Sequence, residues 1–125
     1  NQVTDFTNGI PPGTTPYDTF SESANTATIT KTQTSNDAYL TVEDISIVDG
    51  ARYYLVADIT VNSGTVPDFL FRTGYTAKTD LVSGLNYWEV ISEDTIAAND
   101  MYFYNDALDV FDGEITFTVQ EMYGL

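Results

Sequence analysis

Apolar and polar residues alternate along residues 52–62, and this pattern predicts one long β-strand. The positions of one parity are all apolar: Tyr53, Leu55, Ala57, Ile59 and Val61. The other parity carries Asp58, Thr60 and Asn62. Because successive side chains of a strand point to opposite faces, we expect one face in a core and the other in water. Such a division is typical of an antiparallel sheet layer.

Shorter strand-like runs recur on both sides of this segment. They cover 27–31, 38–42, 66–73, 86–92, 101–105 and 113–122, with 45–48 as a continuation or a bridge and a short strand within 75–82. Gly, Pro, Asn and Asp separate the runs, as expected of turns. About eight strands at this spacing predict an all-β fold, namely an antiparallel two-sheet β-sandwich of the jelly-roll type.

The first part of the chain carries turn residues and scattered apolar positions. Asn8-Gly9 and Pro11-Pro12-Gly13 favour turns. We therefore expect residues 1–25 to form an irregular N-terminal arm on a single domain that spans residues 1–125. Since the sequence begins with Asn1, we also expect it to be a processed product or a piece of a longer polypeptide.

The composition narrows the chemistry. The sequence has 125 residues, 42% of them hydrophobic, with no Cys and no His. It therefore lacks disulfides, thiolate chemistry and the commonest general base. Nineteen acidic residues against four basic ones give a net charge of −15, which disfavours nucleic acid. No apolar run reaches the roughly 20 residues that span a bilayer.

Sequence motifs of catalysis are absent too. The chain has no G-x-S-x-G, Walker A, H-E-x-x-H or G-x-G-x-x-G pattern. A pair of carboxylates could act as in glycosidases, but so acidic a chain offers many pairs without singling one out. We expect a protein that is not an enzyme and has no organic cofactor.

Aromatic residues on two strands suggest a binding surface. If Tyr87, Ile91, Met101 and Phe103 face the core, an exposed platform remains for stacking on sugar rings or on a partner protein. Its members are Trp88, Tyr102 and Tyr104, with Tyr54 and Tyr75 as weaker candidates and Arg72, Asp80 and Asn86 as a polar flank. The alternatives are a face covered by the N-terminal segment or a neighbouring subunit, and a flank that forms only surface ion pairs.

Three segments carry a resemblance to a known family. They are the opening Asn1–Gly9, the central Val48–Ala57 with its G-x-x-Y pattern, and the terminal Phe111–Glu121 with its V-x-E pattern. This layout resembles jelly-roll carbohydrate-binding modules of the family 4/9-like, galactose-binding-like group. Similar domains occur in bacteriophage tail fibres and head decorations. The resemblance implies a sandwich that binds glycans or assembles into a virion.

Acidic residues near the last strand could bind a metal ion. Asp109, Asp112 and Glu114 crowd the turn before it, and hard cations such as calcium prefer clustered oxygen ligands. Modules of the resembled group often hold a structural calcium between early and late strands, which would make Asp5 a partner. The alternative is that these aspartates only form turns.

These observations favour a non-enzymatic virion domain of the decoration or fibre type, placed on a virion surface or outside the cell. Its partners would be capsid, fibre or like subunits, with glycan as a further ligand and self-assembly into an oligomer. Two alternatives stay open. One is a carbohydrate-binding module that stacks sugars on exposed aromatics, and the other is a subunit of an extracellular filament formed by strand addition.

Overall fold

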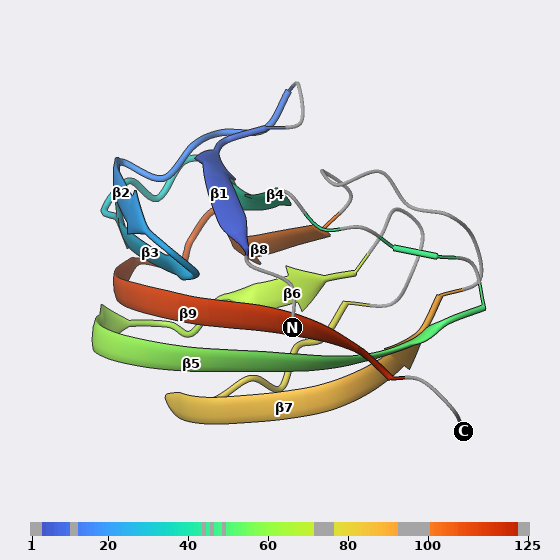
Figure 1. Cartoon of the computed structure of the whole chain (residues 1–125). Coiled ribbons are helices and arrows are strands. Elements are labelled where there is room, and N and C mark those ends of the chain that lie inside the picture. Colours follow the sequence, from blue (N-terminus) through green and yellow to red (C-terminus); the bar gives the residue numbers. More distant parts are fainter. Residues whose placement is uncertain are drawn as a thin grey trace.

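A computed structural model describes residues 4–10, 13–43, 45, 47–48, 50–71, 77–92 and 101–122 of the chain. Nine strands in these residues form two sheets that pack face to face (Figure 1). The strands are β1 Asp5–Asn8, β2 Thr19–Ser23, β3 Thr26–Lys31, β4 Ala38–Glu43, β5 Arg52–Gly64, β6 Asp68–Leu70, β7 Gly84–Ile91, β8 Met101–Asn105 and β9 Phe111–Met122. The predicted antiparallel β-sandwich is confirmed. No helix in the described ranges is long and apolar enough to cross a membrane.

The strand order explains how the two sheets form from one chain. One sheet has the order β1-β4-β8-β6 and the other β2-β3-β9-β5-β7. From β3 onward each strand lies in the sheet opposite to the strand before it, which is the jelly-roll manner of building a sandwich. In Figure 1, β9, β5 and β7 run side by side below, and β1, β4 and β8 lie above them.

The core lies between the sheets and follows the predicted alternation. The inward positions of β5 are 0–1% exposed, and those of β9 and β8 are equally buried: Tyr53, Leu55, Ala57, Ile59, Ile115, Phe117, Val119, Met101 and Phe103. An aromatic cluster fills the centre. Phe117 lies 5.3 Å from Phe69 and 5.1 Å from Phe103 between ring centroids, within the range of favourable aromatic pairs.

Gly113 allows the two longest strands to approach each other. Opposite it, β5 has an irregular register between Val61 and Ser63. A Cβ atom at Gly113 would lie 2.0 Å from the carbonyl oxygen of Thr60, so any side chain here would push β9 away from β5. The glycine thus preserves the pairing of β5 with β9 beside the bulge.

The N-terminal stretch differs from its prediction. Residues 1–25 were expected to be irregular, but β1 and β2 lie within them and pair with β4 and β3. The backbone of buried Tyr17 exchanges hydrogen bonds with the Asn8 side chain at 2.7 and 2.9 Å. The strands are short, and β2 is an exposed edge strand of mainly polar residues, so no apolar alternation marks it.

Lys31 has an unexpected position. Its side chain is 1% exposed, and Nζ donates hydrogen bonds to the backbone oxygens of Gln33, Ala107 and Asp109 at 2.7–2.8 Å. A buried ammonium is tolerated only when hydrogen bonds replace its lost hydration. These three bonds tie the turn between β8 and β9 to the loop after β3.

Candidate functional site

Strand β7 presents two different aromatic residues to opposite faces. Trp88 points between the sheets, with its ring 5.3 Å from Phe69 and 6.4 Å from Phe117. Tyr87 and Ile91 point outward and are 62% and 54% exposed. The sequence prediction, which put Tyr87 and Ile91 in the core and Trp88 outside, is therefore wrong. Both faces of β7 carry apolar residues, so alternation alone could not tell which face is buried.

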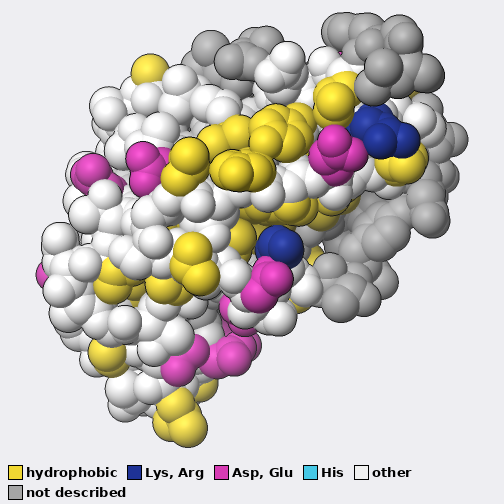
Figure 2. Space-filling view, turned by 90° about the horizontal axis from the view of Figure 1, so that it is seen from below, with side chains coloured by type: hydrophobic (Ala, Val, Ile, Leu, Met, Phe, Trp, Pro, Cys, Tyr) yellow, Lys and Arg dark blue, Asp and Glu magenta, His cyan; other side chains and the backbone are white. Residues whose placement is uncertain are grey.

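The outer face of the five-stranded sheet carries an aromatic pair, of which Tyr87 is exposed and Tyr54 half-buried. The rings of Tyr54 on β5 and Tyr87 on β7 lie 6.0 Å apart with a 38° tilt. Val56 on β5 pairs with Tyr87 in register, Leu85 is the next outward residue before Tyr87 on β7, and Ile91 lies beyond Glu89 on the same strand. Figure 2 shows hydrophobic side chains gathered into a surface band with acidic and basic side chains beside it. We call Tyr54, Tyr87, Val56, Leu85 and Ile91 the apolar band.

Hydrogen-bonding groups accompany the apolar band. Arg52 and Glu89 form an ion pair at 3.1 Å, and Glu89 lies opposite Tyr54, between Tyr87 and Ile91 on β7. Along one side of the band, β9 places Gln120 opposite Tyr54 and Thr118 opposite Val56, both on the outer parity. Beyond them, threonines of β9, β3 and β2 continue the face, with Thr26 and Thr116 hydrogen-bonded through their hydroxyls at 2.9 Å. The face thus combines apolar side chains on β5 and β7 with an ion pair among them and polar side chains on β9.

A second aromatic group lies on the outer face of the other sheet. Tyr39 on β4 and Tyr104 on β8 pair in register and stack at 5.3 Å, with planes 16° apart. Tyr102 meets Tyr39 edge to face at 6.0 Å and is only 6% exposed. Tyr102 and Tyr104 were predicted to share a platform with Trp88. The structure separates them from it, because β8 and β7 belong to different sheets.

Negative charge surrounds this second group. Burial, followed by Asp37 and Asp106, raises the pKa of Tyr39. Burial, followed by Asp68 and Asp106 among other groups, raises the pKa of Tyr104. The pKa of Asp68 is itself raised by burial and then by Asp106 and Asp109. Burial and the neighbouring carboxylates thus favour the neutral forms of Tyr39, Tyr104 and Asp68. Because negative charge is concentrated at this face, a cation would be attracted to it.

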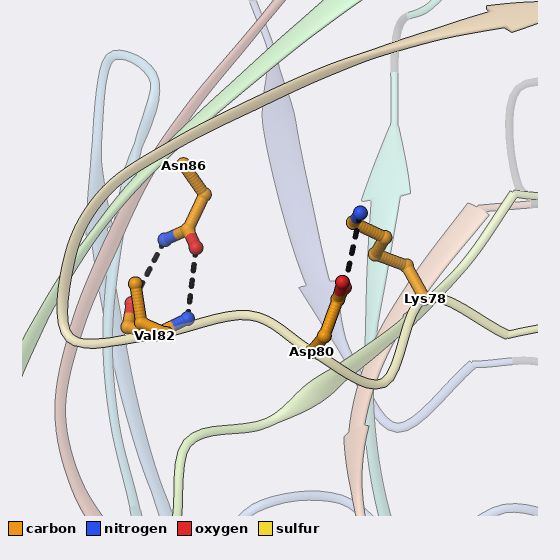
Figure 3. Close-up of polar contacts among 4 residues, drawn as sticks. All are labelled: Lys78, Asp80, Val82 and Asn86. Carbon is orange, nitrogen blue, oxygen red and sulfur yellow. Dashed lines mark hydrogen bonds and ion pairs between the residues drawn. The ribbon is translucent and has the colours of Figure 1, made fainter.

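The predicted polar flank has a structural role near the start of β7 (Figure 3). Asp80 pairs with Lys78 at 3.0 Å, and this contact lowers the pKa of Asp80. The Asn86 amide binds both the backbone nitrogen and oxygen of Val82 at 2.8 Å. Asn86 has the inward parity of Trp88 and so does not adjoin the apolar band. Arg72 and Tyr75 lie outside the described residues.

The four carboxylates predicted to hold calcium do not come together. Asp5 lies on the outer face of the four-stranded sheet, whereas Asp112 and Glu114 lie on that of the five-stranded sheet. The backbone oxygen of Asp109 accepts a hydrogen bond from Lys31. No group of three acidic residues in the described part of the chain is placed to bind a metal. Spacing along the chain could not reveal that the sandwich divides these residues between its faces.

The strand order defines the class of fold: a two-sheet antiparallel β-sandwich of the jelly-roll type. Its structure is similar to the N-terminal cellulose-binding domain of β-1,4-glucanase C from Cellulomonas fimi. The TM-score is 0.57 at 14% sequence identity, over 98% of this chain and 90% of that domain. No family profile matches the sequence, and no curated protein matches it. At this identity the similarity shows the fold, and it lends no support to the predicted link with phage fibres.

Proposed function

We propose that the chain is a non-enzymatic carbohydrate-binding module that holds a neutral glycan chain, in the first instance a β-1,4-glucan, on the outer face of its five-stranded sheet. The observation that carries the proposal is the apolar band, in which Tyr87 is exposed and its ring lies beside that of Tyr54. The similarity to a cellulose-binding domain supports the same class of ligand. Polymeric glycans of this kind would place the protein outside the cell.

The face suits a sugar chain on chemical grounds. A pyranose ring has apolar C–H faces and a rim of hydroxyls, so it can stack on an aromatic ring while its edges form hydrogen bonds. Tyr54 and Tyr87 provide the rings. Gln120, Thr118 and the Arg52–Glu89 pair provide donors and acceptors next to these rings. The sheet face is open along the strands, which suits a chain more than a single sugar.

Removal of the exposed ring tests the proposal. Cellohexaose should bind to the wild type in calorimetric titration, and Tyr87→Ala should weaken binding about 10-fold or more, equivalent to about 1.4 kcal/mol. Tyr87→Phe keeps the ring and should bind nearly as well. Tyr104→Ala removes an aromatic ring from the opposite sheet and should leave the affinity unchanged.

Two results would overturn the proposal. One is the absence of binding to any neutral glycan on an array. The other is glycan binding that survives both Tyr87→Ala and Tyr54→Ala in variants whose thermal unfolding shows that they fold. If another neutral glycan binds and Tyr87→Ala weakens that binding, the proposed carbohydrate-binding role stands and the ligand is that glycan instead of a β-1,4-glucan. The virion and filament roles have no support in the fold, and no observation favours them over this face.

A further inference from the structure

The opposite side of the sandwich has a separate hollow. Its volume is about 320 Å³, and its lining consists of Gly13, Thr14, Thr15, Asn36, Asp37 and Tyr39. The segment at Thr15 runs beside β4, where the backbone nitrogen of Tyr39 donates to the oxygen of Thr15 at 2.9 Å. The volume lies at the lower end of ligand sites and is large enough for one sugar unit.

Tyr39 gives this hollow a firmly held aromatic wall. Its ring is stacked on Tyr104 and receives the edge of buried Tyr102. Because both neighbours restrict its rotation, the ring is already in place before a ligand arrives. Such preorganisation reduces the entropy that binding costs. The remaining lining is polar, with hydroxyl, amide and carboxylate groups.

The described lining of the hollow contains the carboxylate of Asp37 and no basic residue. Asp37 belongs to the lining, and Asp106 acts on both stacked tyrosines. The basic residues of the described part of the chain are engaged elsewhere. Lys31 is buried against three backbone oxygens, Arg52 pairs with Glu89, and Lys78 pairs with Asp80. An aromatic ring beside unpaired carboxylates favours an organic cation.

We propose that this hollow is a second binding site, which takes an amino sugar whose amine is free and protonated. The pyranose ring would lie against Tyr39, the ammonium group beside Asp37, and the sugar hydroxyls among the polar groups of Thr15 and Asn36. A sugar fits better than a lysine side chain, because a flexible alkyl chain would leave the polar lining unused. The site is on a different sheet from the apolar band, so it does not depend on the proposed glucan site.

The test uses the β-1,4-linked glucosamine tetramer as the probe, in calorimetric titrations at mildly acid pH. The wild type should bind it, and should bind the N-acetylated tetramer at least about 10-fold more weakly because acetylation removes the charge. Asp37→Asn and Tyr39→Ala should each lose about 10-fold in affinity. Asp37 is exposed in the loop before β4, so Asp37→Asn keeps the test valid should Tyr39→Ala fail to fold.

A matched control separates a site from general attraction to an acidic protein. Asp58→Asn removes one exposed carboxylate from the other sheet. This variant should bind the glucosamine tetramer as the wild type does. Equal weakening by Asp58→Asn and Asp37→Asn, tighter binding of tetralysine, or no binding of the glucosamine tetramer would each overturn the proposal. Cellohexaose binding by the same variants reports separately on the glucan site.

Discussion

The two outer faces of the sandwich both carry paired tyrosines, but their surroundings differ. Tyr54 and Tyr87 lie in a band of aliphatic side chains with an ion pair beside it. Tyr39 and Tyr104 stack among carboxylates. The residue type is the same, so the neighbours decide which ligand each pair favours. A neutral sugar chain suits the first face, and a cationic sugar suits the second.

The largest effect on stability should come from Trp88, which points between the two sheets. Trp88→Ala removes a ring packed on Phe69 and Phe117 and should lower the free energy of unfolding by about 3 kcal/mol. Tyr87→Ala, one residue away but exposed, should cost less than about 1 kcal/mol. Urea denaturation measures both. Equal losses would mean that β7 does not separate an inner from an outer face.

Lys31→Met should destabilise the turn between β8 and β9 and leave the apolar band unchanged. The variant leaves three backbone oxygens without their charged donor, and we expect a loss of about 2 kcal/mol in urea denaturation. Hydrogen exchange should increase in the turn at residues 106–109 and remain unchanged in β5. An unchanged stability would show that the buried ammonium contributes nothing net, as happens for some buried charges.

The carboxylates near Tyr39 and Tyr104 should make the stability of the protein depend on pH, chiefly through Asp68. The pKa of Asp68 is raised by burial and by Asp106 and Asp109, so the folded state disfavours its ionised form. The resulting cost is absent below the usual pKa of about 3.9 and grows as the pH rises through the raised pKa. Asp68→Asn should therefore be more stable than the wild type at neutral pH. Solvent screening limits the gain to about a few tenths of a kcal/mol.

Thermal unfolding between acid and neutral pH measures this difference, with Asp58→Asn as a control for the reduced net charge. The wild type and Asp68→Asn should converge at low pH. A constant difference across the whole pH range would contradict an origin in ionisation.

The smallest effect on stability should come from loss of the ion pair between Arg52 and Glu89. Arg52 and Glu89 are both nearly half exposed, so Glu89→Gln should change the free energy of unfolding by less than about 0.5 kcal/mol. Cellohexaose affinity should fall more clearly if the Glu89 carboxylate accepts hydrogen bonds from a bound sugar. An affinity equal to that of the wild type would exclude Glu89 from the binding face.

Part of the candidate site could be predicted from the sequence. Tyr54 was a weak candidate and lies in the apolar band, whereas Tyr87 was assigned to the core. Tyr39 was recognised as a residue of a strand, but not as part of an aromatic group. Its partner Tyr104 lies 65 positions along the chain on β8, and only the pairing of β4 with β8 brings the two together. Lys31 shares the parity of the buried residues Ala27 and Ile29, but its three backbone acceptors come from segments that the sequence pattern did not connect with it.

The alternation of residues by itself determined the class of fold and the inner faces of β5 and β9. A strand with apolar residues on only one parity has one way to avoid exposing them. Only the tertiary structure decided which face of β7 is buried, which tyrosines become neighbours and which carboxylates gather around Tyr39 and Tyr104. These features depend on strands far apart in sequence meeting in one sheet. Local periodicity carries no information about such partners.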